Sequence, residues 1–172
     1  SAARAAQADI ATAMNESQVL DTLRASPLAA ELTDAQCRAL AALVVPRTLA
    51  EGEVLVREDQ SDSHLYLIVA GSVAVARAAG TPEEVVLFTL KQGDTVGELS
   101  FLDDNVHYAS VVARGAGTKV LGLERSRFES LLASEPWALY RVMRAIVRRV
   151  HQQQHRLAAQ ASELSNYIYK QH

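Results

Sequence analysis

The sequence contains very little cysteine. Its single cysteine, Cys37, cannot form an internal disulfide or supply a four-cysteine zinc or iron–sulfur site. Thr33 and Gln36 have the spacing of a capping box at a helix start, and Leu32 and Cys37 have the spacing of the accompanying hydrophobic staple. We therefore interpret Cys37 as a packing residue and expect the protein to occupy a reducing, cytoplasmic compartment.

An excess of positive charge and a long uncharged run are also missing. The 172 residues include 17 Lys and Arg against 20 Asp and Glu, which gives a net charge of −3. This balance is not that of a polybasic nucleic-acid binder. No uncharged stretch reaches the roughly 20 residues that span a bilayer, and the Ala-rich beginning lacks the compact apolar segment of a signal peptide. We expect one domain with an appended element and no membrane contact.

Catalytic motifs are absent as well. The sequence has no G-x-S-x-G nucleophile elbow. His64 and His107 are isolated, whereas a cupin-type metal enzyme needs paired histidines and a carboxylate on facing strands. His151 and His155 have an i, i+4 spacing that could hold a metal across a dimer, but we interpret them as surface polar residues. The prediction is a protein that is not an enzyme and has no metal site.

The sequence does show a change at about residue 43 from helical patterns to short β-rich runs. Residues 1–42 contain helical patterns, and residues 43–134 contain short β-rich runs separated by glycines, followed by a short helix. The candidate strands are 54–56, 65–70, 72–77, 84–90, 109–114 and 119–124. Strands at this spacing without long helices between them indicate antiparallel pairing. The sequence predicts an α+β fold, an antiparallel β-roll (double-stranded β-helix or jelly roll) with N-terminal helices.

The third predicted segment, residues 135–172, is a single long helix. No Gly or Pro follows Pro136, so the helix can run for roughly 50 Å at 1.5 Å per residue. Its apolar residues repeat every seven positions, as in a coiled coil. The two repeats are Met143, Val150, Leu157 and Leu164, and Leu139, Ile146, Gln153, Gln160 and Tyr167. We expect a parallel homodimer through residues 139–167.

Four stretches together resemble the cyclic-nucleotide-binding domain of the catabolite-activator (Crp/Fnr-like) family and its relatives in kinases and channels. They are HLYLIVAGSVAVAR at 64–77, KQGDTVGELSFL at 91–102, YASVVA at 108–113 and LERSRFESLLASEP at 123–136. The resemblance covers roughly residues 30–160. It implies a regulatory sensor domain whose ligand is a cyclic nucleotide (cAMP or cGMP) or a related nucleotide, with no other cofactor and with an effector protein of unknown identity.

The resemblance places the ligand against residues 97–110 and the long helix. It implies that the backbone approaches the ligand at Gly97 and that Glu98 accepts the ribose 2′-hydroxyl. Backbone amides at the start of a short helix would face the cyclic phosphate, and Phe88 could fill part of the base pocket. The implied ligand-binding residues are Gly97, Glu98, Leu99, Ser100, His107, Tyr108, Ala109, Arg149 and Gln153.

The segment GELSFLDDNVHYAS, residues 97–110, nevertheless contains no Arg or Lys. Members of the family place an arginine about ten residues after the glycine, where its guanidinium forks onto the phosphate. This sequence has His107 at that position. A neutral imidazole offers one hydrogen-bond donor, whereas a guanidinium can donate two parallel hydrogen bonds. It also cannot balance the negative charge of a phosphodiester. We expect weak binding of cyclic nucleotides, or an altered specificity.

Two alternatives stay open. The chain could be a ligand-independent, dimeric interaction module with a vestigial pocket. It could also be the sensor half of a longer transcription regulator, because the best-known relatives carry a helix-turn-helix module after the long helix and this sequence stops at His172. For the chain as it stands we expect no contact with nucleic acid.

Overall fold

The computed structural model describes residues 14–170. The Ala-rich N-terminal pattern predicted to be helical lies largely outside these residues. The described helices are α2 (Glu16–Arg24), the 3₁₀ turn η1 (Pro27–Ala29), α3 (Asp34–Ala41), α4 (Glu98–Asp103), α5 (Arg125–Glu129), α6 (Leu131–Ser134) and α7 (Pro136–Tyr169). The strands are β1 (Val45–Leu49), β2 (Val54–Val56), β3 (His64–Arg77), β4 (Val85–Lys91), β5 (Thr95–Val96) and β6 (Ser110–Glu124).

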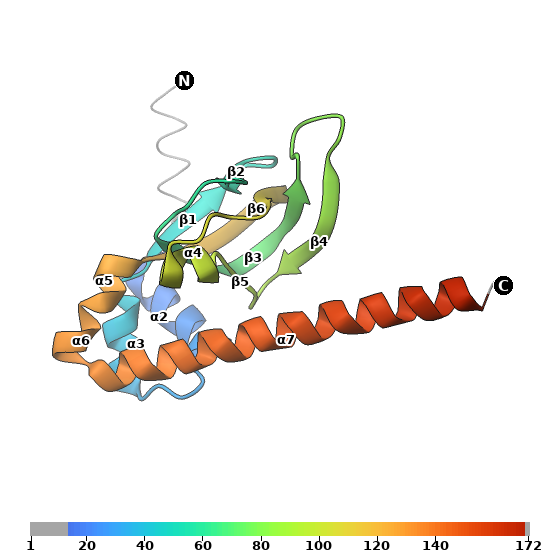
Figure 1. The fold of residues 1–172 in the computed structure, drawn as a ribbon. Coiled ribbons are helices and arrows are strands. Elements are labelled where there is room, and N and C mark those ends of the chain that lie inside the picture. The colour runs from blue at the N-terminus through green and yellow to red at the C-terminus, as the bar shows by residue number, and fades with distance from the viewer. Residues whose placement is uncertain (1–13, 171–172) are drawn as a thin grey trace, which may run out of the picture.

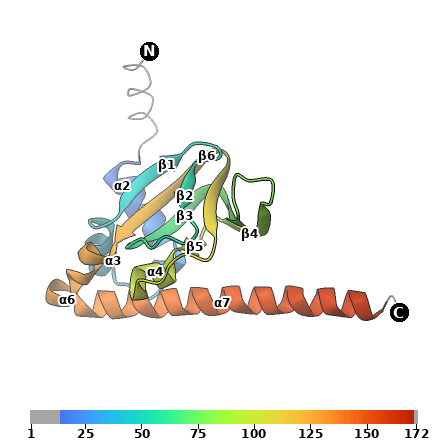
Figure 2. The ribbon, with the colours of Figure 1, turned by 45° about the horizontal axis from the view of Figure 1, so that its top comes forward.

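The strands form an antiparallel roll, as predicted. The order is β1-β6-β3-β4, with β2 pairing to β6 and β5 pairing to β3. The two long strands β3 and β6 pair along most of their length, from His64 opposite Glu124 to Ala76 opposite Ser110. Figures 1 and 2 show the roll on one side of α7, with the N-terminal helices and α5 and α6 at one end. The predicted α+β class is confirmed.

Several predicted strand boundaries are wrong. Residues 65–70 and 72–77 belong to the single strand β3, which passes through Gly71 with register shifts on either side of it. Gly71 has φ +75°, a left-handed conformation that only glycine adopts easily, so the glycine bends the strand rather than ending it. The short strands β1 and β5 were not predicted. Pro46 in β1 is accommodated because β1 lies at the edge of the sheet.

The predicted helix start at Thr33 is confirmed. The Gln36 N–H donates to Thr33 Oγ1 over 3.2 Å, and the Thr33 N–H donates to Gln36 Oε1 over 3.1 Å. Cys37 is 2% exposed, and burial raises the pKa of its thiol. A buried thiol of this kind is a poor nucleophile, which agrees with a packing role.

The core consists of two apolar clusters. The first joins the helices to one end of the roll and includes Leu23, Leu40, Leu65, Phe101, Leu121, Phe128, Val142 and Ile146. The second fills the inside of the roll and includes Leu49, Ile68, Val73, Val75, Leu90, Val111 and Val120. The first cluster fixes the beginning of α7 against the domain, so the helix starts from a rigid base.

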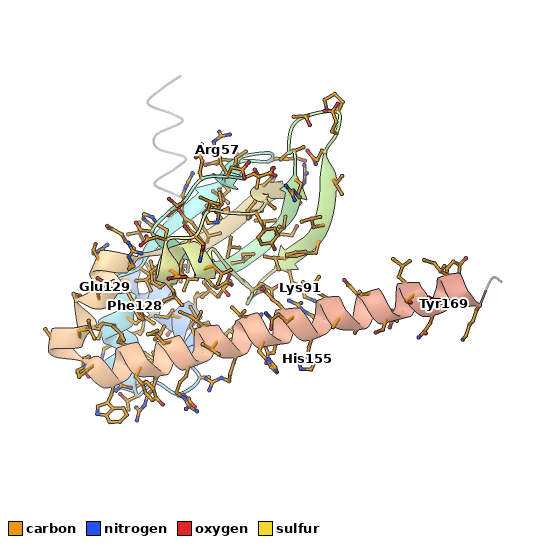
Figure 3. All side chains as sticks on the ribbon, viewed as in Figure 1. Arg57, Lys91, Phe128, Glu129, His155 and Tyr169 are labelled. Atoms are coloured by element: carbon orange, nitrogen blue, oxygen red, sulfur yellow. The ribbon has the colours of Figure 1, made fainter. Side chains whose placement is uncertain are left out.

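The predicted seam of α7 is partly wrong. Ile146 is 1% exposed within a single chain, and Leu139 and Val150 pack against the first core cluster. These residues therefore hold α7 against its own domain. From Gln154 to Lys170 every side chain is exposed, and this half of the helix extends past the roll (Figure 1). The His155 side chain points away from the roll, and Tyr169 marks the far end (Figure 3).

None of the helices within residues 14–170 is both long enough and apolar enough to cross a bilayer.

Candidate ligand pocket

A cavity of about 90 Å³ lies between the inside of the roll, α4 and α7. Its polar or loop residues are Thr95, Gly97, Glu98, Ser100, His107, Tyr108 and Gln153, and its apolar residues are Val75, Phe88, Leu90, Val96, Leu99, Val106, Ala109 and Val111. The cavity thus combines an apolar wall from the strands with a polar rim. All residues predicted to bind the ligand line it except Arg149.

Gly97 makes the turn from β5 into α4. Its φ is +87°, and a Cβ at this position would lie 2.9 Å from the carbonyl oxygen of His64. A larger residue would therefore strain the backbone and press on the neighbouring strand. We expected the absence of a side chain at Gly97 to let a ligand approach the backbone. In the structure β3 approaches Gly97 closely, so the fold itself requires a glycine here.

Glu98 brings a carboxylate into the cavity. Thr95 Oγ1 donates a hydrogen bond to Glu98 Oε1 over 2.5 Å, and Thr95 is itself 1% exposed. Burial raises the pKa of the Glu98 carboxyl group. The pKa of the Tyr108 phenol is also raised, by burial and by the charge of Glu98. Glu98 therefore has an anchored oxygen and remains able to accept a hydroxyl from a ligand.

Ser100 has a structural role in α4. Its Oγ donates to the Asp62 carbonyl oxygen over 2.6 Å and accepts from the Asp62 N–H over 2.7 Å. These bonds tie α4 to the loop before β3. Leu99, by contrast, is 59% exposed at the mouth of the cavity, with nothing packed over it in the described part of the chain.

His107 is held in the cavity wall by its backbone. Its N–H donates to the Gln60 carbonyl over 2.8 Å, and its carbonyl accepts from the Asp59 N–H over 2.8 Å. The ring Nε2 is buried without a hydrogen-bond partner among residues 14–170. Burial lowers the pKa of the imidazole below its ordinary value, so the ring is neutral at pH 7. His107 stands where the resemblance implies a permanently charged arginine, and it carries no charge.

Two residues of α7 were predicted to reach the ligand, and only one lines the cavity. Gln153 does so, and its Nε2 is buried without a partner in the described structure. Arg149 does not, because its guanidinium is engaged with Asp94 Oδ1 over 2.5 Å. The side chains of Arg149 and Asp94 are 18% and 4% exposed. The predicted ligand contact of Arg149 is therefore corrected to an ion pair that holds α7 against the turn before β5.

Sequence reasoning missed much of the apolar wall. It named Phe88 from β4, but Val75 from β3, Leu90 from β4 and Val111 from β6 also line the cavity. The signal was available in part, because Phe88 and Leu90 are two positions apart and residues i and i+2 of a strand share a face. Which face points inward was not evident, since the exposed Val85, Val86 and Leu87 precede them.

The buried Glu98 predicts a specific pH dependence of stability. Its folded-state pKa is raised above the ordinary 4.5, so its contribution to stability is greatest at low pH and is lost as pH rises from the unfolded pKa through the folded one. Glu98→Gln, which cannot ionise, should raise the melting temperature at pH 7, and this gain should shrink toward about pH 4. Thermal unfolding across this pH range measures the difference.

Glu84→Gln is the matched control, because a hydrogen bond from the Gly80 N–H lowers the pKa of Glu84. This substitution should lower the melting temperature at pH 7. An equal effect of both substitutions would contradict the assignment of Glu98 as a carboxyl group destabilised by burial.

The chain is similar in sequence to known proteins. The family model of the cyclic nucleotide-binding domain matches residues 46–135. The cGMP-dependent protein kinase, isozyme 1, of Drosophila melanogaster is 29% identical over 112 residues, which are 64% of this chain and 15% of the kinase. The chain spans less than half the length of the curated relatives it matches, 46% in the case of the cAMP-activated regulator CRP of Salmonella typhimurium.

Two solved structures are also similar. The N-terminal domain of a transcriptional regulator from Streptomyces coelicolor is 29% identical, with a TM-score of 0.65 over 80% of this chain and 95% of that one. The regulatory subunit of a cAMP-independent protein kinase A from Trypanosoma brucei is 25% identical, with a TM-score of 0.67 over 86% of this chain and 51% of that one. A triple mutant of the latter, in which one substitution introduces an arginine, has cAMP bound in its A site.

Proposed function

Because the chain belongs to the family of cyclic nucleotide-binding regulatory domains, we propose that it is a sensor domain with weak affinity for cyclic nucleotides and an altered ligand specificity. Domains of this family are regulatory and typically not catalytic. The observation that carries the proposal is the neutral His107, whose ring Nε2 is buried, in a cavity that keeps the expected residues from Gly97 to Ser100.

The surroundings of the cavity support weak binding of a cyclic phosphate. None of the lining residues is Arg or Lys. The charge of the Arg149 guanidinium acts on Glu98, but this guanidinium is paired with the buried Asp94. Releasing it would leave the buried Asp94 with only its longer contact to Arg156, over 3.4 Å, which is costly. The Trypanosoma brucei protein supports the same reasoning, since it is called cAMP-independent and its mutant with an added arginine holds cAMP.

Calorimetric titration with cAMP and cGMP tests this proposal. We expect dissociation constants weaker than about 10 μM for both, and we expect His107→Arg to strengthen binding of at least one by about 10–100-fold. The gain corresponds to about 1.4–2.8 kcal/mol, which is within the range of one charge-assisted hydrogen bond.

The control variant is Asn105→Arg, which adds the same charge on the exposed part of the loop, outside the cavity. It should change the affinity by less than about threefold, because exposed charges are screened. Tight binding of either nucleotide by the unmodified chain would refute the argument from the missing cation. A folded His107→Arg variant with no gain would favour a vestigial pocket.

The output of the proposed sensor is the position of α7. Gln153 lines the cavity, and one turn earlier Arg149 is paired with Asp94. Asp94 directly precedes β5, whose Thr95 bonds to Glu98. A ligand held by Glu98 and Gln153 would therefore act on the same short segment that fixes α7. Such a contact can bias a two-state element toward one arrangement, which an effector protein would read.

A homodimer through the free part of α7 belongs to the same proposal. Leu139 and Ile146 pack on their own domain, and Val150 does so in part. The stripe that continues along the more exposed side of α7 is Met143, Val147, Val150, Gln154, Leu157, Ala161, Leu164 and Ile168, apolar except for Gln154. Its members are spaced alternately by four and three residues, as in a coiled coil. Most helical stability in proteins comes from packing of an apolar face, and this stripe has nothing packed over it from Gln154 to Lys170 in the described chain. A second copy of α7 is therefore the partner that fits.

Light scattering at tens of micromolar should therefore show a dimer. The double substitution Leu157→Glu with Leu164→Glu should convert it to a monomer, because four like charges would face each other across the seam. Ala159→Glu, on the opposite face of the same exposed segment, should leave the dimer intact. A monomeric unmodified chain would remove the dimer from the proposal.

The sensor half of a longer transcription regulator is a second candidate. The observation in its favour is the match to the N-terminal domain from Streptomyces coelicolor, 95% of which is covered. The natural reading frame decides between the two candidates: a helix-turn-helix module encoded after residue 172 would establish the regulator.

A further inference from the structure

The charge around the cavity restricts the class of ligand, if the chain is the sensor proposed above. Glu98 is the one lining residue with a formal charge. Outside the lining, the negative charge of Asp62 acts on His107, and Arg149 is neutralised by Asp94. An anion entering the cavity would meet a carboxylate and leave its hydration shell without gaining a cation. An uncharged ligand avoids this cost.

Two unpaired polar atoms show where such a ligand would bond. Gln153 Nε2 and His107 Nε2 are both buried and without hydrogen-bond partners in the described residues. The amide is a donor, and the neutral imidazole nitrogen donates or accepts according to its tautomer. Buried polar groups are normally satisfied, so unpaired ones call for an explanation. A ligand with a hydrogen-bonding ring edge and hydroxyl groups would satisfy both and would also donate to Glu98.

The walls favour a planar ring. Phe88, Leu90 and Val75 provide an apolar surface inside the roll, which suits an aromatic ring. The cavity of about 90 Å³ is smaller than the roughly 300–1,000 Å³ of most ligand sites. Leu99 and Val106 at the mouth are 59% and 60% exposed, so they can move outward without breaking core contacts.

We propose that the pocket binds an uncharged, nucleoside-like ligand, a planar hydrogen-bonding base with a neutral sugar, in preference to the corresponding cyclic nucleotide. Gln153 donates to the base, Glu98 accepts from the sugar hydroxyls, and His107 lies where the phosphate of a nucleotide would lie.

Two matched pairs of compounds test this inference in the full chain: adenosine with cAMP, and guanosine with cGMP. The members of each pair share base and sugar and differ by the cyclic phosphate. Calorimetric titration should show at least one nucleoside binding at least about tenfold more tightly than its cyclic nucleotide. Equal or tighter binding of both cyclic nucleotides overturns this inference and leaves the sensor assignment standing. No binding of any of the four overturns both.

Variants then locate the bound ligand. Gln153→Leu, which keeps the size of the side chain but removes its amide, should weaken nucleoside binding at least about tenfold. Gln160→Leu, on the exposed part of the same helix, should leave it unchanged. His107→Arg should shift the preference toward the cyclic nucleotide. Nucleoside binding that neither Gln153→Leu nor His107→Arg alters would lie elsewhere and would overturn the inference.

Discussion

Asp94→Ala is expected to destabilise the protein by about 3–5 kcal/mol, the usual cost of leaving one charge of a buried ion pair without its partner. Asp94 is 4% exposed on its side chain, and Arg149 is 18% exposed. Asp94 Oδ2 also accepts from the Lys91 N–H over 3.0 Å, so the substitution removes a bond that shapes the turn before β5. Chemical denaturation with urea measures the loss.

A compensated variant distinguishes a charge effect from a damaged turn. Asp94→Ala combined with Arg149→Met removes both charges, and a large part of the lost stability should return. Asp94→Asn keeps the side-chain oxygen that the Lys91 N–H requires and should cost less than Asp94→Ala. A loss below about 1 kcal/mol in Asp94→Ala would mean that the pair behaves like one on the surface.

Gly71→Ala is expected to cost roughly 2–5 kcal/mol, through backbone strain of about 1–2 kcal/mol at positive φ and overpacking of about 1–3 kcal/mol. The φ of Gly71 is +75°, and an added Cβ would lie 2.8 Å from the Cα of Thr118. Thr118 is completely buried and lies in the middle of β6, so it cannot move aside easily. Urea denaturation measures the free energy of unfolding.

Gly52→Ala separates the two contributions. Gly52 has nearly the same φ, +78°, but an added Cβ there would meet nothing within 4 Å. It should therefore show the backbone strain alone, about 1–2 kcal/mol. Equal losses in the two variants would show that the contact with Thr118 adds nothing.

The same glycine explains one failure of the strand prediction, the division of β3 into two strands. A sequence with Gly71 between two apolar runs reads as two strands joined by a turn. In the structure β3 continues through the glycine, because β6 pairs with it on both sides and only the register shifts. Local chemistry signalled an unusual backbone at Gly71, but pairing partners more than forty residues away decided that the strand bends there.

The pocket was predictable where its residues are close in sequence. The residues from Gly97 to Ser100 and from His107 to Ala109 line the cavity as expected, and the absence of a cation at His107 was evident from the sequence. Arg149 was assigned wrongly because its partner, Asp94, is 55 positions away. The periodicity of a helix gives no information about an ion-pair partner so far away in the sequence.

The coiled-coil pattern shows a related limit. Heptad spacing identifies an apolar stripe on a helix but not the surface that covers it. Leu139 and Ile146 satisfy the pattern, yet their own domain covers them. Only the fold separates the part of α7 that is already packed from the part that is free.

The length of α7 beyond its contact with the roll gives it mechanical leverage. If the helix pivots at the pair of Arg149 with Asp94, it continues from there without interruption to Tyr169. Twenty further residues correspond to about 30 Å of rigid rod, so a tilt of about 10° at the pivot would swing the tip by about 5 Å. A small tilt beside Asp94 would thus become, at the far end, a displacement about as large as the rise of one helical turn.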